Sequence, residues 1–322
     1  MKKGLLLSLV TVFLWAVESV FSRYAVTEWQ VQPFVFTGVA LLVGAIAMML
    51  GAGRARGGGS GSRAWDRQTL AFSIFEVLIF LFFVFLVGQV SATEANFLNR
   101  ISIPLVLAAG WLVFSRRPLP LDGPVIGLVL IGMVLLVWGL EDSVRWPALG
   151  LSVLIGLCQV GRTMAAETHK GFGRAVSIAE RCCVTGQVLA FTCVIFLLLS
   201  LALASVRHAF FGADVAGYWR MAPGFSDFVH GPTLLLAALM GITVVWSMTY
   251  FYLYASRVAR SEVFLAVVAL LPFMTFLVEY LAGRFGLLDI SMVGLESLLP
   301  GGLIVAGAVL IIYARRRPGF RD

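Results

Sequence analysis

Charged side chains are scarce in this chain, and so are cysteine and histidine. Of its 322 residues, 13% are Asp, Glu, Lys or Arg and 60% are hydrophobic, whereas a soluble domain carries about 25% charged residues. Such a composition excludes a soluble enzyme, a secreted disulfide scaffold and a disordered tail. The four cysteines show no CxxC or Cys/His ligand spacing, so they indicate no disulfide and no metal site.

Motifs of enzymes and of ATP-driven pumps are also missing. The apolar stretches contain no HExxH, Gly-x-Ser-x-Gly or paired catalytic Asp motif, and there is no Walker nucleotide-binding loop. The three histidines, His169, His208 and His230, have no partner at metal-ligand spacing. We therefore expect no enzymatic activity, no metal ion and no cofactor.

Long apolar runs are what the sequence contains instead. A run of about 20 apolar residues crosses a bilayer core, and such runs recur along the whole chain. The ten predicted spans are Leu5–Phe21, Pro33–Gly51, Leu70–Val90, Thr93–Phe114, Pro124–Leu140, Ala148–Thr168, Val176–Leu203, Thr233–Tyr254, Val263–Leu281 and Met292–Tyr313. The first contains Trp15 and Glu18 and lacks a small-residue cleavage site, which favours a retained helix over a signal peptide. The chain is predicted to be an all-α polytopic membrane protein with ten transmembrane helices.

Basic side chains are distributed unevenly over the connecting segments. With the N-terminus in the cytoplasm, the inner segments hold most of the 24 Lys and Arg, including the run Arg315–Arg317. The outer segments hold only Arg23, Arg145, Arg207, Arg220 and Arg284. Because cytoplasmic loops collect Lys and Arg, this pattern predicts both termini in the cytoplasm. The net charge of +7 thus reflects topology rather than nucleic-acid binding. The excess of Arg over Lys suggests a GC-rich bacterial genome, so we expect a multi-pass protein of the bacterial inner membrane.

The fourth and ninth spans resemble each other when their sequences are aligned with Glu94 opposite Glu262. In the same alignment Pro104 falls on Pro272, and Arg116 falls on Arg284. If spans one to five repeat as six to ten, an odd number of crossings separates the copies, so the copies have opposite orientations. Inverted repeats of this kind recur among secondary transporters, with the substrate site near the midplane. We expect a first five-helix repeat over residues 1–141, a second over 146–315 and a basic cytoplasmic tail over 316–322.

This pattern resembles the drug/metabolite transporter superfamily, in particular its ten-helix EamA-like branch. The residues that carry the resemblance are Trp15 with Arg23, Ala92 and Ala95 with Pro104, and Ala259 with Pro272. The resemblance implies a carrier that exports or exchanges amino acids, nucleotide sugars, quaternary amines or drugs. Its cavity would be lined mainly by helices one, three, four, six, eight and nine. The sequence departs from the family at Arg117 and Phe285, where relatives often carry an acid.

Polar and ionisable side chains inside the predicted spans are the candidate site residues. An ionisable group at mid-membrane costs roughly 2.5–3.5 kcal/mol on insertion scales, so it usually faces a partner or a water-filled cavity. In the first span, polar residues recur every three or four positions and form one stripe. The candidate substrate-binding residues are Trp15, Glu18, Glu76, Asn96, Arg100, Gln159, Arg162, Trp246 and Tyr250. Glu94 and Glu262 open their spans and are expected to complement the helix dipole.

Depth along the helices suggests two ion pairs, an outer one of Glu18 with Arg100 and an inner one of Arg162 with Glu76 or Glu180. Such pairs either fix helix register without any ligand or release one partner to bind a charged substrate. An arginine suits a carboxylate or phosphate, a glutamate among aromatics suits an ammonium group, and both together suit a zwitterion. Glu18 and Glu76 are also candidate proton carriers.

Three kinds of function remain open at this point. The favoured one is a secondary carrier for a small polar or zwitterionic metabolite, amino-acid-like or an amine, working by alternating access. The alternatives are a membrane-embedded enzyme, against which the missing motifs count, and a non-transporting assembly or sensor subunit or a flippase for a lipid-linked substrate. The expected partners are a small-molecule substrate and membrane lipid, with a homodimer left open and no nucleic acid.

Overall fold

The computed structural model describes residues 2–53, 66–87, 89–90, 92–211, 222–286 and 295–314, and within these ranges it is helical without strands. Within the described residues, each predicted apolar run overlaps a helix. Among the described residues, eight helical segments are long and apolar enough to cross a membrane, and two shorter apolar helices, Asp122–Trp138 and Pro300–Ala314, accompany them. The prediction of an all-α polytopic membrane protein is confirmed. The predicted tail, 316–322, lies outside the described residues.

Some helices run uninterrupted and others are divided into pieces. The uninterrupted helices are α1 (Lys2–Trp29), α2 (Pro33–Gly51), α3 (Arg67–Val87), α6 (Asp122–Trp138), α7 (Asp142–Glu167), α9 (Ile178–Phe211) and α14 (Leu295–Ala314). The divided ones are α4 (Ala92–Leu98) with η2 (Asn99–Ile101) and α5 (Ser102–Phe114), α10 (Gly231–Met240) with η5 (Gly241–Val245) and α11 (Trp246–Ala259), and α12 (Ser261–Val268) with α13 (Leu271–Arg284). A short helix, α8 (Lys170–Arg174), follows α7, and a 3-10 turn, η4 (Phe225–Val229), precedes α10.

The ends of two helices differ from the sequence prediction. The first helix continues to Trp29 instead of ending near Phe21, and the seventh continues to Phe211 instead of Leu203. Nothing in α1 interrupts the backbone hydrogen bonds until Gln30, whose φ of 50° ends the helix. Hydropathy marks the part of a helix that suits lipid, and it does not mark the end of the helix itself.

Two of the breaks coincide with the prolines that the sequence comparison aligned. Pro104 lies in the first turn of α5, just after the 3-10 turn of η2, and Pro272 lies at the start of α13, just after α12. A proline ring removes a backbone N–H and clashes with the preceding turn, so helices commonly break or begin there. Both helices are therefore interrupted at corresponding positions, and each break frees backbone carbonyl groups inside the protein.

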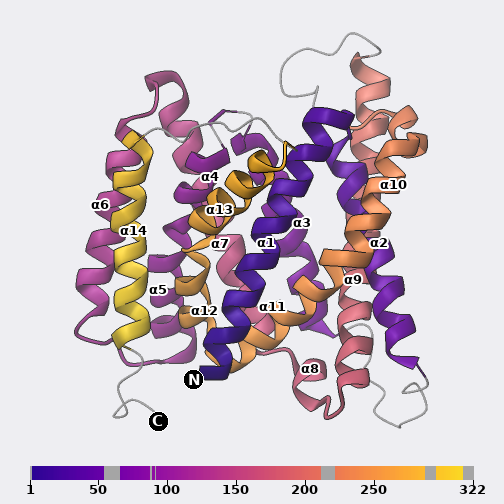
Figure 1. Cartoon of the computed structure of the whole chain (residues 1–322). Coiled ribbons are helices and arrows are strands. Elements are labelled where there is room, and N and C mark those ends of the chain that lie inside the picture. Colours follow the sequence, from indigo (N-terminus) through magenta and orange to yellow (C-terminus); the bar gives the residue numbers. More distant parts are fainter. Residues whose placement is uncertain are drawn as a thin grey trace.

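The helices pack in pairs that join early parts of the chain to late ones (Figure 1). The most extensive contacts join α2 with α9, α3 with α7, α6 with α14, and α1 with α11. α1 begins and α14 ends at the same face of the protein, the lower one in Figure 1. We call this the N-terminal face and the other the opposite face.

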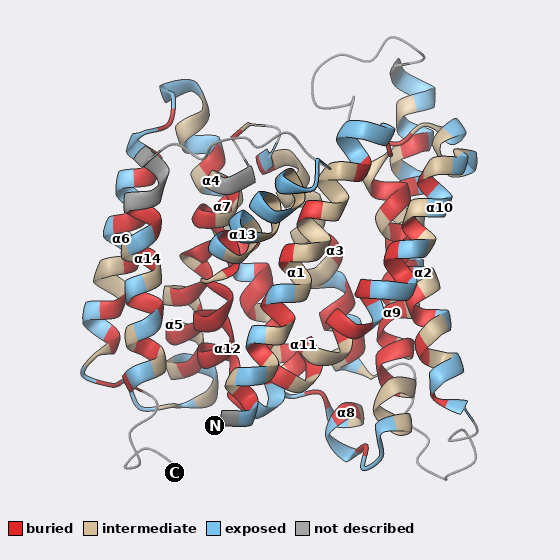
Figure 2. Cartoon of the chain, in the orientation of Figure 1, coloured by how far each residue is buried: buried red, intermediate tan, exposed pale blue. Residues whose placement is uncertain are grey.

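Burial is highest where these pairs meet and lowest on the outside of the bundle (Figure 2). Large apolar side chains are nevertheless exposed around the perimeter: Leu50 is 76% exposed, Leu112 83% and Leu235 72%. Exposed apolar surface on this scale is unfavourable in water, but the hydrocarbon core of a bilayer accommodates it. The perimeter is therefore the surface that lipid covers.

The backbone of η5 at Gly241 lies very close to helix α2, and a substitution of this glycine tests that contact. A Cβ atom there would lie 2.6 Å from the carbonyl oxygen of Ala40 in α2 and 2.9 Å from Cβ of Val43. Small residues let membrane helices approach this closely. We expect Gly241→Ala to lower the free energy of unfolding by about 1–3 kcal/mol, the usual cost of overpacking, measured by reversible denaturation in detergent.

The matched control is Gly127→Ala in α6, because no atom lies within 4 Å of a Cβ built there. Replacing a glycine inside a helix at an open position is expected to stabilise by about 0.5–1 kcal/mol. Equal effects of the two substitutions would show that the contact between η5 and α2 is not as close as described.

Candidate functional site

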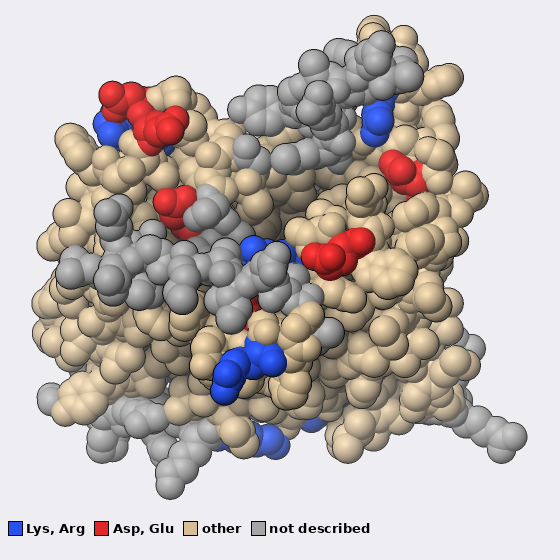
Figure 3. Space-filling model, turned by 45° about the horizontal axis from the view of Figure 1, so that its top comes forward, with Lys and Arg blue, Asp and Glu red and all other residues tan. Residues whose placement is uncertain are grey.

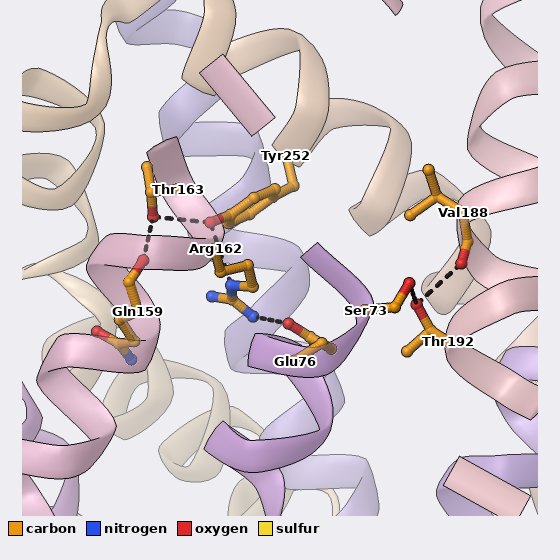
Figure 4. Close-up of polar contacts among 8 residues, drawn as sticks. All are labelled: Ser73, Glu76, Gln159, Arg162, Thr163, Val188, Thr192 and Tyr252. Atoms are coloured by element: carbon orange, nitrogen blue, oxygen red, sulfur yellow. Dashed lines mark hydrogen bonds and ion pairs between the residues drawn. The ribbon is translucent and has the colours of Figure 1, made fainter. Parts of the chain in front are cut away.

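Arg162 of α7 lies at the centre of the bundle, with only 4% of its surface exposed. Its guanidinium forms an ion pair with Glu76 of α3, and its Nε donates a hydrogen bond of 3.1 Å to the hydroxyl oxygen of Tyr252 in α11 (Figure 4). Arg162 with Glu76 is one of the two inner pairs expected from the sequence. The other candidate, Glu180, instead accepts a 2.8 Å hydrogen bond from the backbone N–H of Val176.

Aromatic rings complete the surroundings of the Arg162 guanidinium. Its Cζ lies 5.0 Å from the ring centre of Trp15 in α1 and 4.6 Å from that of Tyr252, within cation–π range. The hydroxyl of Thr163 donates to the carbonyl oxygen of Gln159, so it accepts at 2.8 Å from the hydroxyl of Tyr252. Arg162 is thus held by one anion, one hydroxyl and two ring faces, which fixes its position.

A cavity of about 70 Å³ lies beside this cluster, between the two parts of the chain. Its lining residues come from α1, α2 and α3 and from α9, α10, η5 and α11: Glu18, Phe36, Thr37, Ala40, Leu41, Glu76, Phe80, Phe196, Met240, Val245, Met248 and Thr249. Two carboxylates therefore face a cavity whose walls are otherwise mostly aromatic, aliphatic or thioether. No lysine or arginine is among these lining residues.

Arg100 does not meet Glu18, and the expected outer pair is therefore wrong. Arg100 is 1% exposed, and its Nε donates to the carbonyl oxygen of Asn96 at 2.9 Å and its Nη1 to that of Val268 at 2.7 Å. Val268 is the last residue of α12, where the break leaves carbonyl groups without helical partners. A cation at the C-terminal end of a helix is favoured by the helix dipole. Arg100 thus joins the two broken helices.

The remaining predicted site residues are placed around this centre rather than together. Gln159 is 7% exposed and lies one turn before Arg162. Trp246 is 36% exposed, and its indole N–H donates to the carbonyl oxygen of Ile242, so it does not line the cavity. Tyr250 packs against Phe172 of α8 at a ring-centre distance of 6.1 Å, near the N-terminal face. Asn96 is half-buried, and its backbone carbonyl is what Arg100 contacts.

Tyr252 is a central residue that the sequence reasoning missed. Its ring packs against Phe264 at 4.9 Å, Trp15 at 5.5 Å and Phe72 at 5.6 Å, and its hydroxyl joins Arg162 to Thr163. The stripe of aromatics at every fourth position in this helix includes Trp246 and Tyr250 but leaves Tyr252 on another face. Spacing alone therefore pointed to the wrong face of α11.

A second group of charges closes the N-terminal face between the two parts of the chain. Arg116, after α5, forms ion pairs with Glu167 at the end of α7 and with Glu262 in α12, the latter at 2.6 Å. Glu167 also accepts hydrogen bonds from the backbone N–H of Ser261 at 3.0 Å and from its hydroxyl. Glu262 is 1% exposed, so its role goes beyond the helix-dipole role expected from the sequence. We call these four residues the N-terminal-face cluster.

Gly110 makes room for this cluster, because a Cβ there would lie 2.7 Å from Oε1 of Glu262. At the opposite face, Arg23 of α1 forms a 2.7 Å ion pair with Glu279 of α13. Figure 3 views this opposite face and shows acidic and basic side chains next to a hollow in it. Among the described residues, no three His, Cys, Asp or Glu side chains gather to hold a metal ion.

The N-terminal-face cluster yields a stability prediction. Arg116→Gln leaves the Glu167 and Glu262 carboxylates without their shared cation, and removing one partner of a buried pair costs about 3–5 kcal/mol. We expect a loss of about 3 kcal/mol in the free energy of unfolding, because Arg116 is 17% exposed and water screens part of the effect.

Arg117 provides the matched control, since it is the next residue, carries the same charge and is exposed. Arg117→Gln is expected to change the free energy of unfolding by less than about 0.5 kcal/mol. A loss in Arg116→Gln no larger than that in Arg117→Gln would contradict a structural role of the cluster.

Comparison with known proteins agrees with this architecture. Twenty-three chains of solved structures match. One of them, described only as a crystal structure of a protein, has a TM-score of 0.62 and 17% identity over 98% of this chain and 99% of its own. At this identity the likeness shows the fold alone. No functionally curated protein matches the chain.

The first part of the chain matches a family model. Residues 2–138 match the EamA-like transporter family, which covers α1 to α6 and includes Trp15, Glu18, Glu76 and Arg100. This match is consistent with the drug/metabolite transporter superfamily that the sequence resembled. Residues 2–138 of this chain are therefore similar to the EamA-like transporters, which are membrane transporters of the drug/metabolite type and not enzymes.

Proposed function

We propose that this protein is a secondary active carrier that exports or exchanges a small polar or zwitterionic metabolite, amino-acid-like or an amine. The observation that carries the proposal is the cavity lined by Glu18 and Glu76. Its walls come from α1 to α3 on one side and from α9 to α11 on the other. Substrate sites of secondary transporters lie between two such halves. The substrate would enter this cavity when one face opens and leave it when the other does.

The proposed halves are two inverted five-helix repeats over residues 1–141 and 146–315, in ten spans with both termini in the cytoplasm. The contact pattern supports this symmetry. In the two repeats α1 corresponds to α7, and α3 corresponds to α11. The equivalent pairs α1·α11 and α3·α7 both pack extensively. The hydrogen bond from Arg100 to the carbonyl oxygen of Val268 also supports it, because these positions are 168 residues apart, the shift that aligns Glu94 with Glu262. The halves would rock about this crossing of the two broken helices.

Ion pairs between the halves lie at both faces and would act as gates. The N-terminal-face cluster joins α5 to α7 and α12, and Arg23 with Glu279 joins α1 to α13. Alternating access requires that each set opens in turn while the other stays closed. With the N-terminus inside, the cluster at Arg116 would face the cytoplasm of a bacterial inner-membrane protein.

Glu18 and Glu76 are the candidate proton carriers of this cycle. Glu76 is ion-paired with Arg162, so it has a fixed partner in the structure. Glu18 faces Glu76 and Arg162 but forms no ion pair with described residues. We therefore assign proton exchange to Glu18, with Glu76 and Arg162 as a fixed neutral pair beside it.

Flux through liposomes that contain only this protein tests the proposal. A carrier exchanges labelled substrate for unlabelled substrate across such a membrane without any other component. An assembly or sensor subunit gives no flux without its partner, and a flippase moves a lipid-linked substrate but no soluble metabolite. The screen should cover amino acids, polyamines, quaternary amines and nucleotide sugars. Absence of flux for every class would overturn the proposed function.

A further inference from the structure

Two cations meet at one tyrosine on the N-terminal face of the protein. Nζ of Lys3 in α1 lies 5.0 Å from the ring centre of Tyr254 in α11, and Cζ of Arg181 in α9 lies 4.7 Å from it. Arg181 also lies over the ring of Phe172 in α8, at 5.9 Å. We call these four residues the Tyr254 group. Cation–π contacts hold a cation in place without cancelling its charge, so the group concentrates two positive charges in one place.

Neither cation of the Tyr254 group has a carboxylate partner. Among the residues that the structure describes, no ion pair involves Lys3 or Arg181. Glu180 is next to Arg181 in the sequence, but its carboxylate accepts a 2.8 Å hydrogen bond from the backbone N–H of Val176. Nε of Arg181 donates to the carbonyl oxygen of Ala175 at 3.3 Å, and that oxygen carries no formal charge. An anion from outside the chain would therefore meet two cations without a competitor for either.

The segment that joins α8 to α9 exposes apolar side chains close to these charges. Val176 is 87% exposed, and Ile178, one turn before Arg181, is 72% exposed. α8 lies at the lower edge of the protein in Figure 1, beside the start of α9. Bulky apolar side chains beside Lys and Arg are typical of segments that lie in the membrane interface, where the apolar groups enter the acyl region and the cations reach phosphate groups. The Tyr254 group therefore borders on lipid.

We propose that Lys3 and Arg181 bind the phosphate of an anionic phospholipid, such as phosphatidylglycerol, in the leaflet at the N-terminal face. A phosphate accepts charge-assisted hydrogen bonds from both a guanidinium and an ammonium group, and the acyl chains would cover Val176 and Ile178. A zwitterionic headgroup would bring its own cation up to two others, which disfavours it. Lys3 belongs to the first proposed half and Arg181 to the second, so the bound phosphate would link the halves. The site does not depend on which substrate is carried.

Native mass spectrometry of the purified protein in detergent tests the site, with phosphatidylglycerol, phosphatidylcholine and glycerol 3-phosphate as probes. We expect the wild type to retain one phosphatidylglycerol more tightly than phosphatidylcholine, and glycerol 3-phosphate not to displace it. The double variant Lys3→Gln with Arg181→Gln should bind phosphatidylglycerol about 10- to 100-fold more weakly, as expected for the loss of two cations near a lipid phosphate. Arg67→Gln with Arg117→Gln removes two exposed charges and is the matched control, expected to leave binding unchanged.

A second measurement uses the wild-type protein and does not depend on the folding of a variant. In nanodiscs, adding phosphatidylglycerol to phosphatidylcholine is expected to slow the acetylation of Lys3 more than that of Lys170, which is exposed on α8, as read by peptide mass spectrometry. Equal slowing at both lysines, or equal weakening in the two double variants, would reduce the effect to general surface attraction and overturn the site. Equal retention of the two lipids would also overturn it. Displacement by glycerol 3-phosphate would overturn the lipid as the source of the phosphate.

Discussion

Replacing Arg162 with glutamine is expected to lower the free energy of unfolding by about 3–5 kcal/mol, because it leaves the Glu76 carboxylate without its cation in a buried site. The same change removes the cation–π contacts with Trp15 and Tyr252 and the hydrogen bond to the Tyr252 hydroxyl. Transport is expected to be lost with stability. Reversible unfolding in detergent measures the first effect, and uptake into proteoliposomes the second.

The double variant Glu76→Gln with Arg162→Gln separates a structural pair from a substrate-binding pair. If the pair only neutralises itself, the double variant recovers much of the stability that Arg162→Gln loses, with a coupling energy of about 0.5–3 kcal/mol. Uptake of substrate should then return in part, because Glu18 is still present. Recovery of stability without any uptake would instead assign the pair to substrate binding.

Glu18→Gln is expected to reduce transport to the level of empty liposomes while the protein stays folded and membrane-inserted. Glutamine keeps the size of the side chain but removes both the negative charge that faces the cavity and the group that exchanges a proton. Because Glu18 forms no ion pair among the described residues, its neutralisation leaves no other charge unbalanced. Stability should therefore change little, in contrast to Arg162→Gln.

Two further variants on the same helix act as controls for Glu18. Glu18→Asp keeps the charge one methylene further back and should retain part of the transport. Glu28→Gln removes an exposed carboxylate and should transport like the wild type. Wild-type transport in Glu18→Gln would remove Glu18 from the mechanism.

The helical spans could be predicted from the sequence, because a helix needs about 20 apolar residues to cross the bilayer core. Each predicted run overlaps a helix within the part of the chain that the structure describes. The ends of the helices could not be predicted from the sequence. Helix α1, for example, continues to Trp29 and stops only where Gln30 adopts a positive φ. That conformation depends on the contacts of the following turn rather than on hydropathy.

The centre of the site was partly predictable. Rare charges on polar stripes identified Glu18, Glu76 and Arg162, because a buried charge needs a partner or a cavity. The choice of partners was not predictable for Arg100. It lies in the 3-10 turn at Asn99–Ile101, where residues advance by about 120° instead of 100° around the axis. The pair with Glu18 was expected from depth in the membrane alone, and depth does not tell which way the Arg100 side chain points, which is toward the carbonyl oxygens of Asn96 and Val268.

The accessibility of the cavity from both sides of the membrane tests the carrier account most directly. Thr37 lines the cavity and carries no charge, so Thr37→Cys, in a chain whose four native cysteines are replaced, provides a probe. A membrane-impermeant thiol reagent is expected to label this position from outside in right-side-out vesicles and from the cytoplasmic side in inverted ones. Bound substrate should slow both reactions. Labelling from one side only, in the presence and absence of substrate, would contradict alternating access.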